Sequence, residues 1–169
     1  MRLFVGLQPT PEFREALTQI QGRLRAAGVA GRYLDPSNLH MTLAFIGEWP
    51  DDVTELLPTV ENPFPITLSY IGIFDEADVL WAGVESSKTL NNLAKRVRHD
   101  LADAGVPFDR KAFNPHITLM RKPSIPSRVM LADIEIPSAT MMVDDVCLYR
   151  SDRSKSGMMY SVIGCSRNE

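Results

Sequence analysis

A long internal repeat is the feature that most limits how this chain can fold. Segments 3–7 (LFVGL) and 80–84 (LWAGV) lie 77 positions apart, and each is followed by a helix-like segment. His40 and His116 then occur 76 positions apart, in the similar apolar segments LHMTL and PHITL. Because strand-like, helix-like and histidine-bearing segments all recur at nearly one offset, the sequence predicts a strand, helix, histidine-strand unit that occurs twice.

Strand and helix signals within the two units predict an α+β fold. Helices are expected over residues 11–28 and 87–105, where apolar residues recur at helical spacing and a glycine suits the end. The other expected elements are a short helix within 51–57 and strands over 2–8, 40–47, 65–74, 78–85, 116–121, 134–136, 141–149 and 158–165. No Gly- or Ser-rich linker separates the units, so we expect a single domain, residues 1–169, that is bilobal and pseudo-two-fold, with two intertwined lobes sharing one cleft.

Composition and charge exclude several classes of protein. A hydrophobic fraction of 44% and a charged fraction of 23% are those of an ordinary folded protein. A net charge of −3 argues against a broad basic surface for long nucleic acid, although it is compatible with a local basic pocket. No apolar run reaches the length of a membrane span, and the N-terminal segment is too short for a secretory signal. We therefore expect a cytoplasmic protein with no membrane partner.

The two cysteines lie in apolar surroundings without a C-x-x-C spacing. This pattern is more typical of buried thiols than of a disulfide or a metal-binding pair. Cys147 and Cys165 are therefore expected to be buried free thiols.

The two histidine segments each place an imidazole and a hydroxyl on one strand face. Alternate side chains of an extended strand share a face, so His40 is expected beside Thr42, and His116 beside Thr118. The opposite face of the first strand is expected to hold three apolar residues, Met41, Leu43 and Phe45. If the two units pack with approximate two-fold symmetry, the two histidines face each other across the cleft.

Two facing imidazoles can act as an acid and a base, because imidazole titrates near pH 6.5. In a displacement at phosphorus, one imidazole would take a proton from the attacking water and the other would protonate the departing oxygen. Thr42 and Thr118 would donate hydrogen bonds to the phosphate, and Arg121 is the nearest candidate guanidinium. Arg121 lies five positions after His116, on the opposite face of a regular strand. It can serve the site only if the strand ends or bulges first, and the following Lys-Pro pair favours an end.

Other chemistries have less support in the sequence. Neither H-x-T segment contains a carboxylate, so a metal site would need distant Asp or Glu residues, and no metal is expected. No G-x-S-x-G motif is present, and neither cysteine neighbours a histidine in the sequence, which argues against a serine or cysteine nucleophile. No glycine-rich phosphate loop occurs, so no ATP or NAD cofactor is expected.

Essentially the whole chain resembles the 2H phosphoesterases, and among them the bacterial and archaeal RNA 2',3'-cyclic phosphodiesterases first named 2'-5' RNA ligases. The resemblance rests on segments 38–47 and 115–122 with their H-x-T motifs, on segment 3–7, and on a closing segment, 148–151, with Gly157 and Tyr160. It implies antiparallel sheets lining a central groove, and metal-independent hydrolysis of a terminal 2',3'-cyclic phosphate to a 2'-phosphate. The reverse reaction would be a 2'-5' RNA ligation.

The resemblance also implies a role for each candidate site residue. His40 would protonate the leaving 3' oxygen, and His116 would activate water. Thr42 and Thr118 would hold the phosphate, and the arginine of the family pattern falls on Arg121. RNA ends or nucleotides bearing a 2',3'-cyclic phosphate are the implied partners, and a monomer is expected. Two other functions stay open: a 2H enzyme for another cyclic nucleotide or 2'-5'-linked substrate, and a non-catalytic RNA-binding module.

Overall fold

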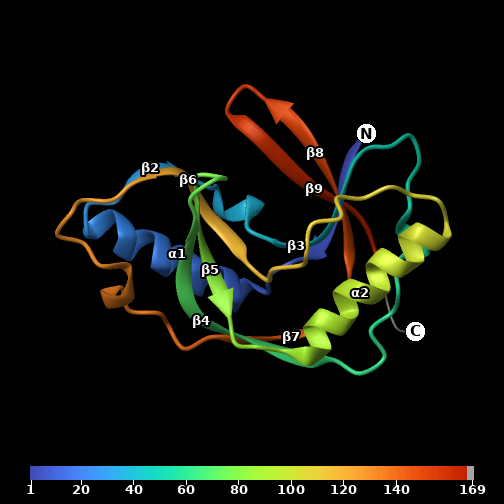
Figure 1. Ribbon diagram of the computed structural model, residues 1–169, viewed down its shortest axis with the longest axis horizontal. Helices are drawn as coiled ribbons and strands as arrows, with labels where there is room; N and C mark the ends of the chain where they lie inside the picture. Colours follow the sequence, from blue (N-terminus) through green and yellow to red (C-terminus); the bar gives the residue numbers. More distant parts are fainter. Residues whose placement is uncertain (167–169) are drawn as a thin grey trace.

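The computed structural model describes residues 1–166, which form a nine-stranded antiparallel sheet and two long helices (Figure 1). The strands are β1 (Arg2–Leu7), β2 (Ala30–Tyr33), β3 (Met41–Glu48), β4 (Phe64–Phe74), β5 (Val79–Val84), β6 (Ile117–Ser124), β7 (Thr140–Val143), β8 (Cys147–Ser154) and β9 (Gly157–Cys165). The helices are α1 (Pro11–Ala26) and α2 (Lys88–Asp103), with short 3-10 turns at Pro36–Asn38, Thr54–Leu56 and Leu131–Asp133. The expected α+β class is confirmed.

The order of strands in the sheet follows the sequence repeat. The path runs β7-β4-β5-β6-β3-β1-β8-β9, with β2 paired to β6 away from this path. At its centre, β3 and β6 pair at Met41 and Ile117, which are the residues that directly follow the two histidines. Outward from this pair, β1 and β5 occupy corresponding places, as do β8 and β4. The halves also exchange contacts, because β2 of the first unit pairs with β6, and the Asp109 N–H donates to Phe45 O at 2.8 Å.

Both helices form where the sequence predicts them, but α1 ends at Ala26 instead of residue 28, and α2 spans Lys88–Asp103 instead of 87–105. Thr10 Oγ1 accepts a hydrogen bond from the Phe13 N–H at 3.3 Å, and the hydroxyl of Ser87 caps α2 in the same way at 3.1 Å. Beyond the last helical residues, Gly28 and Gly105 have φ values of +95° and +75°, a conformation in which a side chain would be strained. The repeated capping pattern therefore gives two helices of equal length in corresponding positions.

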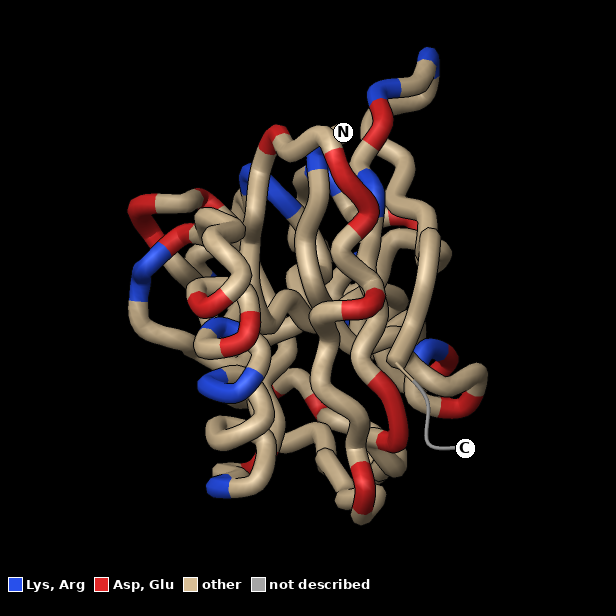
Figure 2. The backbone as a smooth tube through the Cα atoms, turned by 90° about the vertical axis from the view of Figure 1, so that its right-hand side faces the viewer, with Lys and Arg blue, Asp and Glu red and all other residues tan. Residues whose placement is uncertain are grey.

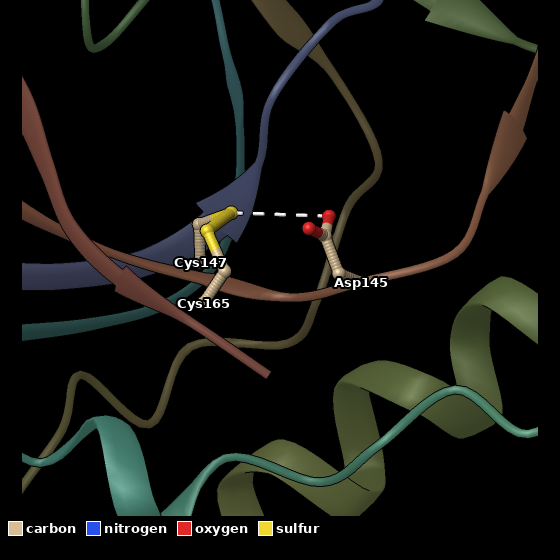
Figure 3. A group of neighbouring side chains, drawn as sticks. All are labelled: Asp145, Cys147 and Cys165. Atoms are coloured by element: carbon tan, nitrogen blue, oxygen red, sulfur yellow. Dashed lines mark hydrogen bonds between the residues drawn. A yellow bond between two sulfur atoms is a disulfide. The ribbon is translucent and has the colours of Figure 1, made fainter. Parts of the chain in front are cut away.

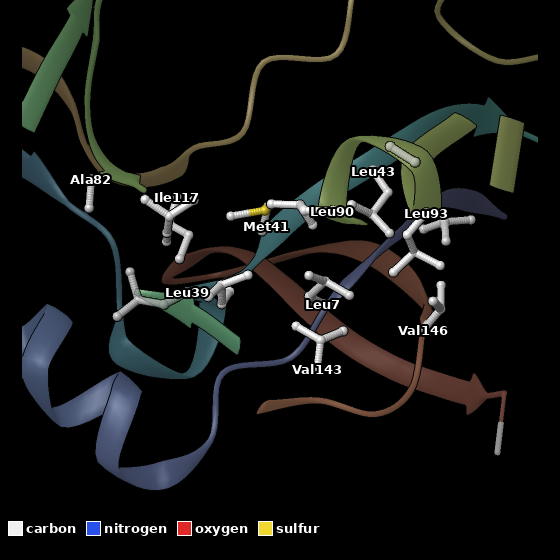
Figure 4. Packing of buried hydrophobic residues seen from close by; sticks show 14 of the residues in the cluster. Leu7, Leu39, Met41, Leu43, Ala82, Leu90, Leu93, Ile117, Val143 and Val146 are labelled. Carbon is white, nitrogen blue, oxygen red and sulfur yellow. The ribbon is translucent and has the colours of Figure 1, made fainter. Parts of the chain in front are cut away.

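The main hydrophobic core lies between the helices and one face of the sheet (Figure 4). The predicted helix stripes are buried in it: Phe13, Ala16, Leu17, Ile20 and Leu24 from α1, and Leu90, Leu93, Ala94, Val97 and Leu101 from α2. Strand residues such as Leu7, Met41, Leu43 and Ile117 complete this core. On β1, Leu3 and Val5 point into the core, whereas Phe4 belongs to a second, smaller cluster with Tyr149. The helices thus cover one sheet face, and the alternate residues face the opposite side.

Three expected elements differ in the structure. The strand predicted over 134–136 is wrong: Ile134 and Ile136 pack against the core from a chain segment that follows a 3-10 turn and has no strand partner within residues 1–166. The strand predicted over 141–149 is two strands, because β7 pairs with β4 and β8 pairs with β1 in the other half of the sheet. The short helix within 51–57 is a single 3-10 turn. Strand β2, which is mostly exposed and lacks apolar alternation, was not predicted.

Among residues 1–166, no helix has both the length and the apolar character needed to cross a membrane.

Candidate active site

The two histidines lie immediately before the first residues of the two central strands. His40 directly precedes β3 and His116 directly precedes β6, and the next residues, Met41 and Ile117, pair with each other. The approximate two-fold axis that relates the two halves therefore passes between the two imidazoles. A cleft of about 960 Å³ opens at this point, and it is lined by all five predicted site residues: His40, Thr42, His116, Thr118 and Arg121.

Each histidine strand contains a β-bulge just after its threonine. On β6, Thr118 pairs with Trp81 and Met120 pairs with Leu80, so Leu119 is an extra residue that reverses the alternation. Beyond the bulge, Arg121 returns to the face of Thr118 and lines the cleft. The strand therefore bulges rather than ends, since β6 continues through the Lys-Pro pair to residue 124.

The corresponding bulge on β3 corrects one prediction. Thr42 pairs with Gly6 and Ala44 pairs with Val5, which leaves Leu43 as the extra residue. As a result Phe45 does not share the buried face with Met41 and Leu43, as expected, but lines the cleft, where the Arg2 guanidinium lies 4.9 Å from its ring centre. Phe45 and Arg121 are 76 positions apart. The two halves therefore present an aromatic ring and a guanidinium at equivalent places, which makes the cleft chemically asymmetric.

A polar side chain from each helix holds the bulge of the opposite half. Gln21 Nε2 on α1 donates to Leu119 O at 2.9 Å and to Leu34 O at 3.0 Å. On α2, Arg98 Nε donates to Leu43 O at 3.1 Å. Gln21 and Arg98 lie 77 positions apart, so this brace is part of the repeat. We did not predict either residue, although the offset places both at equivalent helical positions.

Main-chain carbonyls fix the orientation of both imidazoles. His40 Nδ1 lies 2.7 Å from Asn38 O, and His116 Nδ1 lies 2.6 Å from Asn114 O. A carbonyl oxygen can only accept, so each Nδ1 carries the proton and donates it. In the neutral form, Nε2 of each ring then holds a lone pair, and that of His40 accepts from Thr42 Oγ1 at 3.0 Å.

Aromatic rings surround both histidines and lower their pKa values. The ring centres of Phe4, Tyr149 and Tyr160 lie 4.6, 5.5 and 5.1 Å from that of His40. Burial lowers the pKa of His40 to about 4, and the charges of His116 and Arg121 add to this effect, against the opposing hydrogen bond to Asn38.

The second histidine has a smaller aromatic wall. Phe74 and Trp81 lie 4.9 and 5.8 Å from His116, measured between ring centres. Burial lowers the pKa of His116 as well, and its hydrogen bond to Asn114 opposes the shift. Trp81 and Phe4 lie 77 positions apart, so the repeat places an aromatic residue against each histidine. Both imidazoles are therefore neutral in the free site at pH 7.

Asn38 links His40 to the β8–β9 hairpin and was not predicted as a site residue. While its main-chain oxygen holds His40, its side-chain Nδ2 donates to Met158 O at 2.8 Å and its Oδ1 accepts from the Tyr160 N–H at 3.1 Å. The amide thus bonds to the edge of β9 as a neighbouring strand would. This bond holds Tyr160 against the His40 ring.

The cysteine prediction is wrong: Cys147 and Cys165 form a disulfide between β8 and β9 (Figure 3). The two residues are direct register partners with a Cα–Cα distance of 4.0 Å, a pairing that depends on the sheet and not on sequence spacing. Asp145 Oδ1 lies 3.9 Å from Cys147 Sγ. A reduced Cys147 thiol could donate a proton to this oxygen, whereas a disulfide sulfur has no proton to donate. Donor atoms of all three residues lie within 4.8 Å of one another. Sulfurs joined in a disulfide are not thiolate ligands, so the oxidised pair does not provide a metal site.

Comparisons with known proteins agree with this geometry. A family model described as the 2'-5' RNA ligase superfamily matches residues 9–155. A relative from Aquifex aeolicus named RNA 2',3'-cyclic phosphodiesterase is 30% identical over 184 residues, covering 96% of this chain and 95% of the relative. A relative of the same name from Thermotoga maritima is 29% identical over 175 residues, covering 96% and 93%.

Solved structures have the same fold. A protein of Thermus thermophilus superposes with a TM-score of 0.76 at 27% identity, covering 98% of this chain and 97% of that chain. Escherichia coli LigT, in a structure complexed with 3'-AMP, superposes with a TM-score of 0.75 at 27% identity, covering 97% and 95%.

Proposed function

The chain belongs to the 2'-5' RNA ligase superfamily, and from this membership we propose that it is an RNA 2',3'-cyclic phosphodiesterase. It hydrolyses a terminal 2',3'-cyclic phosphate to a 2'-phosphate. The observation that carries the proposal is the pair of imidazoles with fixed tautomers that line one cleft together with Arg121. The names of the Aquifex and Thermotoga relatives support the same substrate.

The reaction needs one proton acceptor and one proton donor. Nε2 of neutral His116 takes a proton from water, and the water oxygen attacks phosphorus. The bond from phosphorus to the 3' oxygen breaks, and protonated Nε2 of His40 gives its proton to that oxygen, which leaves a 3'-hydroxyl and a 2'-phosphate. The anionic phosphate favours the charged imidazole, so substrate binding raises the pKa of His40 from its low value in the free site.

Arg121 and the two threonines hold the phosphate. The Arg121 guanidinium, which the bulge turns into the cleft, stabilises the charge on the non-bridging oxygens. The Thr118 hydroxyl donates a hydrogen bond to the phosphate. The Thr42 hydroxyl does so once protonation of His40 ends its bond to Nε2. The histidines supply both proton transfers, so no step requires a metal. A 2'-hydroxyl in place of water gives the reverse 2'-5' ligation.

The working form we propose is a monomer that acts on RNA ends or nucleotides in the cytoplasm. One chain provides all five site residues, which supports a complete site without a second copy.

Hydrolysis of an RNA carrying a terminal 2',3'-cyclic phosphate, in the presence of a chelator, tests the proposal. We expect a 2'-phosphate product and a loss of about 10²–10⁴-fold in kcat in both His40→Ala and His116→Ala. Arg121→Ala is expected to lower kcat/KM, whereas Arg128→Ala, an exposed arginine that does not line the cleft, serves as its matched control. Full activity in either histidine variant, or activity only with added metal, contradicts the mechanism.

A further inference from the structure

The active-site cleft is basic in a chain that is acidic overall. Four arginines line it (Arg2, Arg121, Arg150 and Arg153), against two carboxylates, Glu48 and Asp152. The whole chain has a net charge of −3. The positive charge is therefore concentrated where an anionic chain would enter, and three of these six residues belong to β8.

The β8–β9 hairpin projects beyond the rest of the sheet (Figure 1). Its turn lies between Ser154 and Gly157, and Figure 2 shows basic residues at its tip. Arg153 and Lys155 are both exposed, and within residues 1–166 neither forms an ion pair, whereas Arg150 pairs with Asp152 at 3.1 Å. Two cations at the tip are thus available to a ligand.

One face of this hairpin continues from the catalytic histidine to the tip. Register partners share a sheet face, and Ser151 pairs with Tyr160 while Arg153 pairs with Met158. Tyr160 packs on the His40 ring, so the same face carries an aromatic ring, then a thioether and a guanidinium, over about 7 Å of strand. Met158 is 38% exposed, so it is a large apolar side chain at the surface and not part of the core. The arrangement combines apolar surface for bases with cations for phosphates.

We propose that this face of the β8–β9 hairpin binds the RNA strand on the 5' side of the terminal cyclic phosphate, so that oligoribonucleotides are preferred over mononucleotides. The inference rests on the proposed function and adds the part of the substrate beyond the reacting nucleotide. Arg153 and Lys155 contact backbone phosphates, and Tyr160 and Met158 contact the bases next to the end. Asn38, which bonds to both Tyr160 and Met158 through their main chain, holds this surface in line with His40.

A second path out of the cleft is less favourable for RNA. Hollows on the α2 side share Phe113 and Arg98, and they carry three cations, Lys95, Arg98 and Lys111. Three carboxylates, Glu76, Glu85 and Asp109, line the same surface. Balanced charge gives little net attraction for phosphates, so we assign the strand to the hairpin and use Lys95 to test the other path.

The test compares a nucleoside 2',3'-cyclic phosphate with a short oligoribonucleotide ending in the same group. We expect the charge-reversed variant Arg153→Glu/Lys155→Glu to lose about tenfold more kcat/KM on the oligonucleotide than on the mononucleotide. Its dependence of log kcat/KM on log salt should fall by about 0.7 for each phosphate that the variant no longer neutralises. Lys95→Glu, an exposed lysine on α2, is the matched control and should leave the ratio between the two substrates unchanged.

Two outcomes overturn the inference while the proposed function stands: equal losses on both substrates in the hairpin variant, or a selective loss of oligonucleotide activity in Lys95→Glu. If the wild-type protein hydrolyses neither the mononucleotide nor the oligonucleotide, the proposed function is overturned instead. Fluorescence anisotropy of a labelled oligoribonucleotide then tests the hairpin without turnover, since binding must weaken in the charge-reversed variant. Arg153→Ala/Lys155→Ala repeats the comparison with a milder change if the reversed charges lower the melting temperature.

Discussion

Gln21 Nε2 donates a 2.9 Å hydrogen bond to the main-chain oxygen of Leu119, the extra residue of the bulge in β6. The bulge turns Arg121 into the cleft, so a buried amide on a helix determines where the guanidinium lies. The Gln21 side chain is 2% exposed. Its Nε2 donates a second hydrogen bond, to Leu34 O, so both of its N–H donors bind main-chain carbonyls and not water. We therefore expect Gln21 to influence the reaction only through the position of Arg121.

Replacing Gln21 by Met keeps the size of the side chain and removes both donated bonds. We expect the free energy of unfolding to fall by about 1–3 kcal/mol, because the partly buried Leu34 carbonyl loses this partner. We also expect a lower kcat/KM, measured on a cyclic phosphate, and a much smaller further loss when the change is made in Arg121→Ala. Gln19→Met, at an exposed position of the same helix, is the control. An equal loss of activity with and without Arg121 would mean that Gln21 has a structural role only.

Asn38→Ala removes the two side-chain bonds to β9 and keeps the main-chain oxygen that accepts from His40. We expect faster hydrogen exchange of the Tyr160 amide, because that N–H loses its acceptor. The pKa of His40 should rise as Tyr160 leaves the ring and water enters, which an NMR titration of the imidazole measures. Asn92→Ala, on the exposed face of α2, should change neither quantity. An unchanged His40 titration would show that Tyr160 contributes little to its desolvation.

Much of the fold could be predicted from the sequence because its signals are local. The helix caps at Thr10 and the glycines after each helix depend on neighbouring residues, and the repeat offset relates one half to the other. The pairing of Met41 with Ile117 follows from that symmetry, and it brings the five predicted residues to one cleft.

What could not be predicted depends on contacts between distant segments. The bulges at Leu43 and Leu119 are held by side chains from helices of the opposite half, and a regular alternation rule cannot place a residue beyond a bulge. For this reason regular alternation places Phe45 on the wrong face, and it places Arg121 on the cleft face only if the strand is interrupted at a position that the sequence does not identify. The Cys147–Cys165 disulfide likewise depends on the register of β8 and β9, which no spacing rule contains.

The pH dependence of kcat/KM should reach its maximum on the acid side of pH 6.5. This quantity reports the free enzyme, in which the pKa of His40 is lowered to about 4 and that of His116 is lowered below 6.5. The rate rises with pH as the base becomes neutral and falls as the acid loses its proton, so both limbs lie below pH 6.5. The profile of kcat should lie at higher pH, because the bound phosphate favours imidazolium. A kcat/KM maximum above pH 7 would contradict the burial of the two rings.

Acid should destabilise the protein through His40 well before its carboxylates are protonated. The pKa of this ring is about 4 in the folded chain and near 6.5 when unfolded, so between these values the unfolded chain binds a proton that the folded chain does not. Stability is therefore fully present above pH 6.5 and is lost as the pH falls toward 4, by up to about 3 kcal/mol. Urea unfolding measured across this range checks the slope. His40→Gln should make the slope shallower, with the remainder coming in part from His116, whose pKa burial also lowers. His99→Gln, at an exposed histidine on α2, should leave the slope unchanged. An equal slope in the wild type and in His40→Gln would assign the loss to other groups.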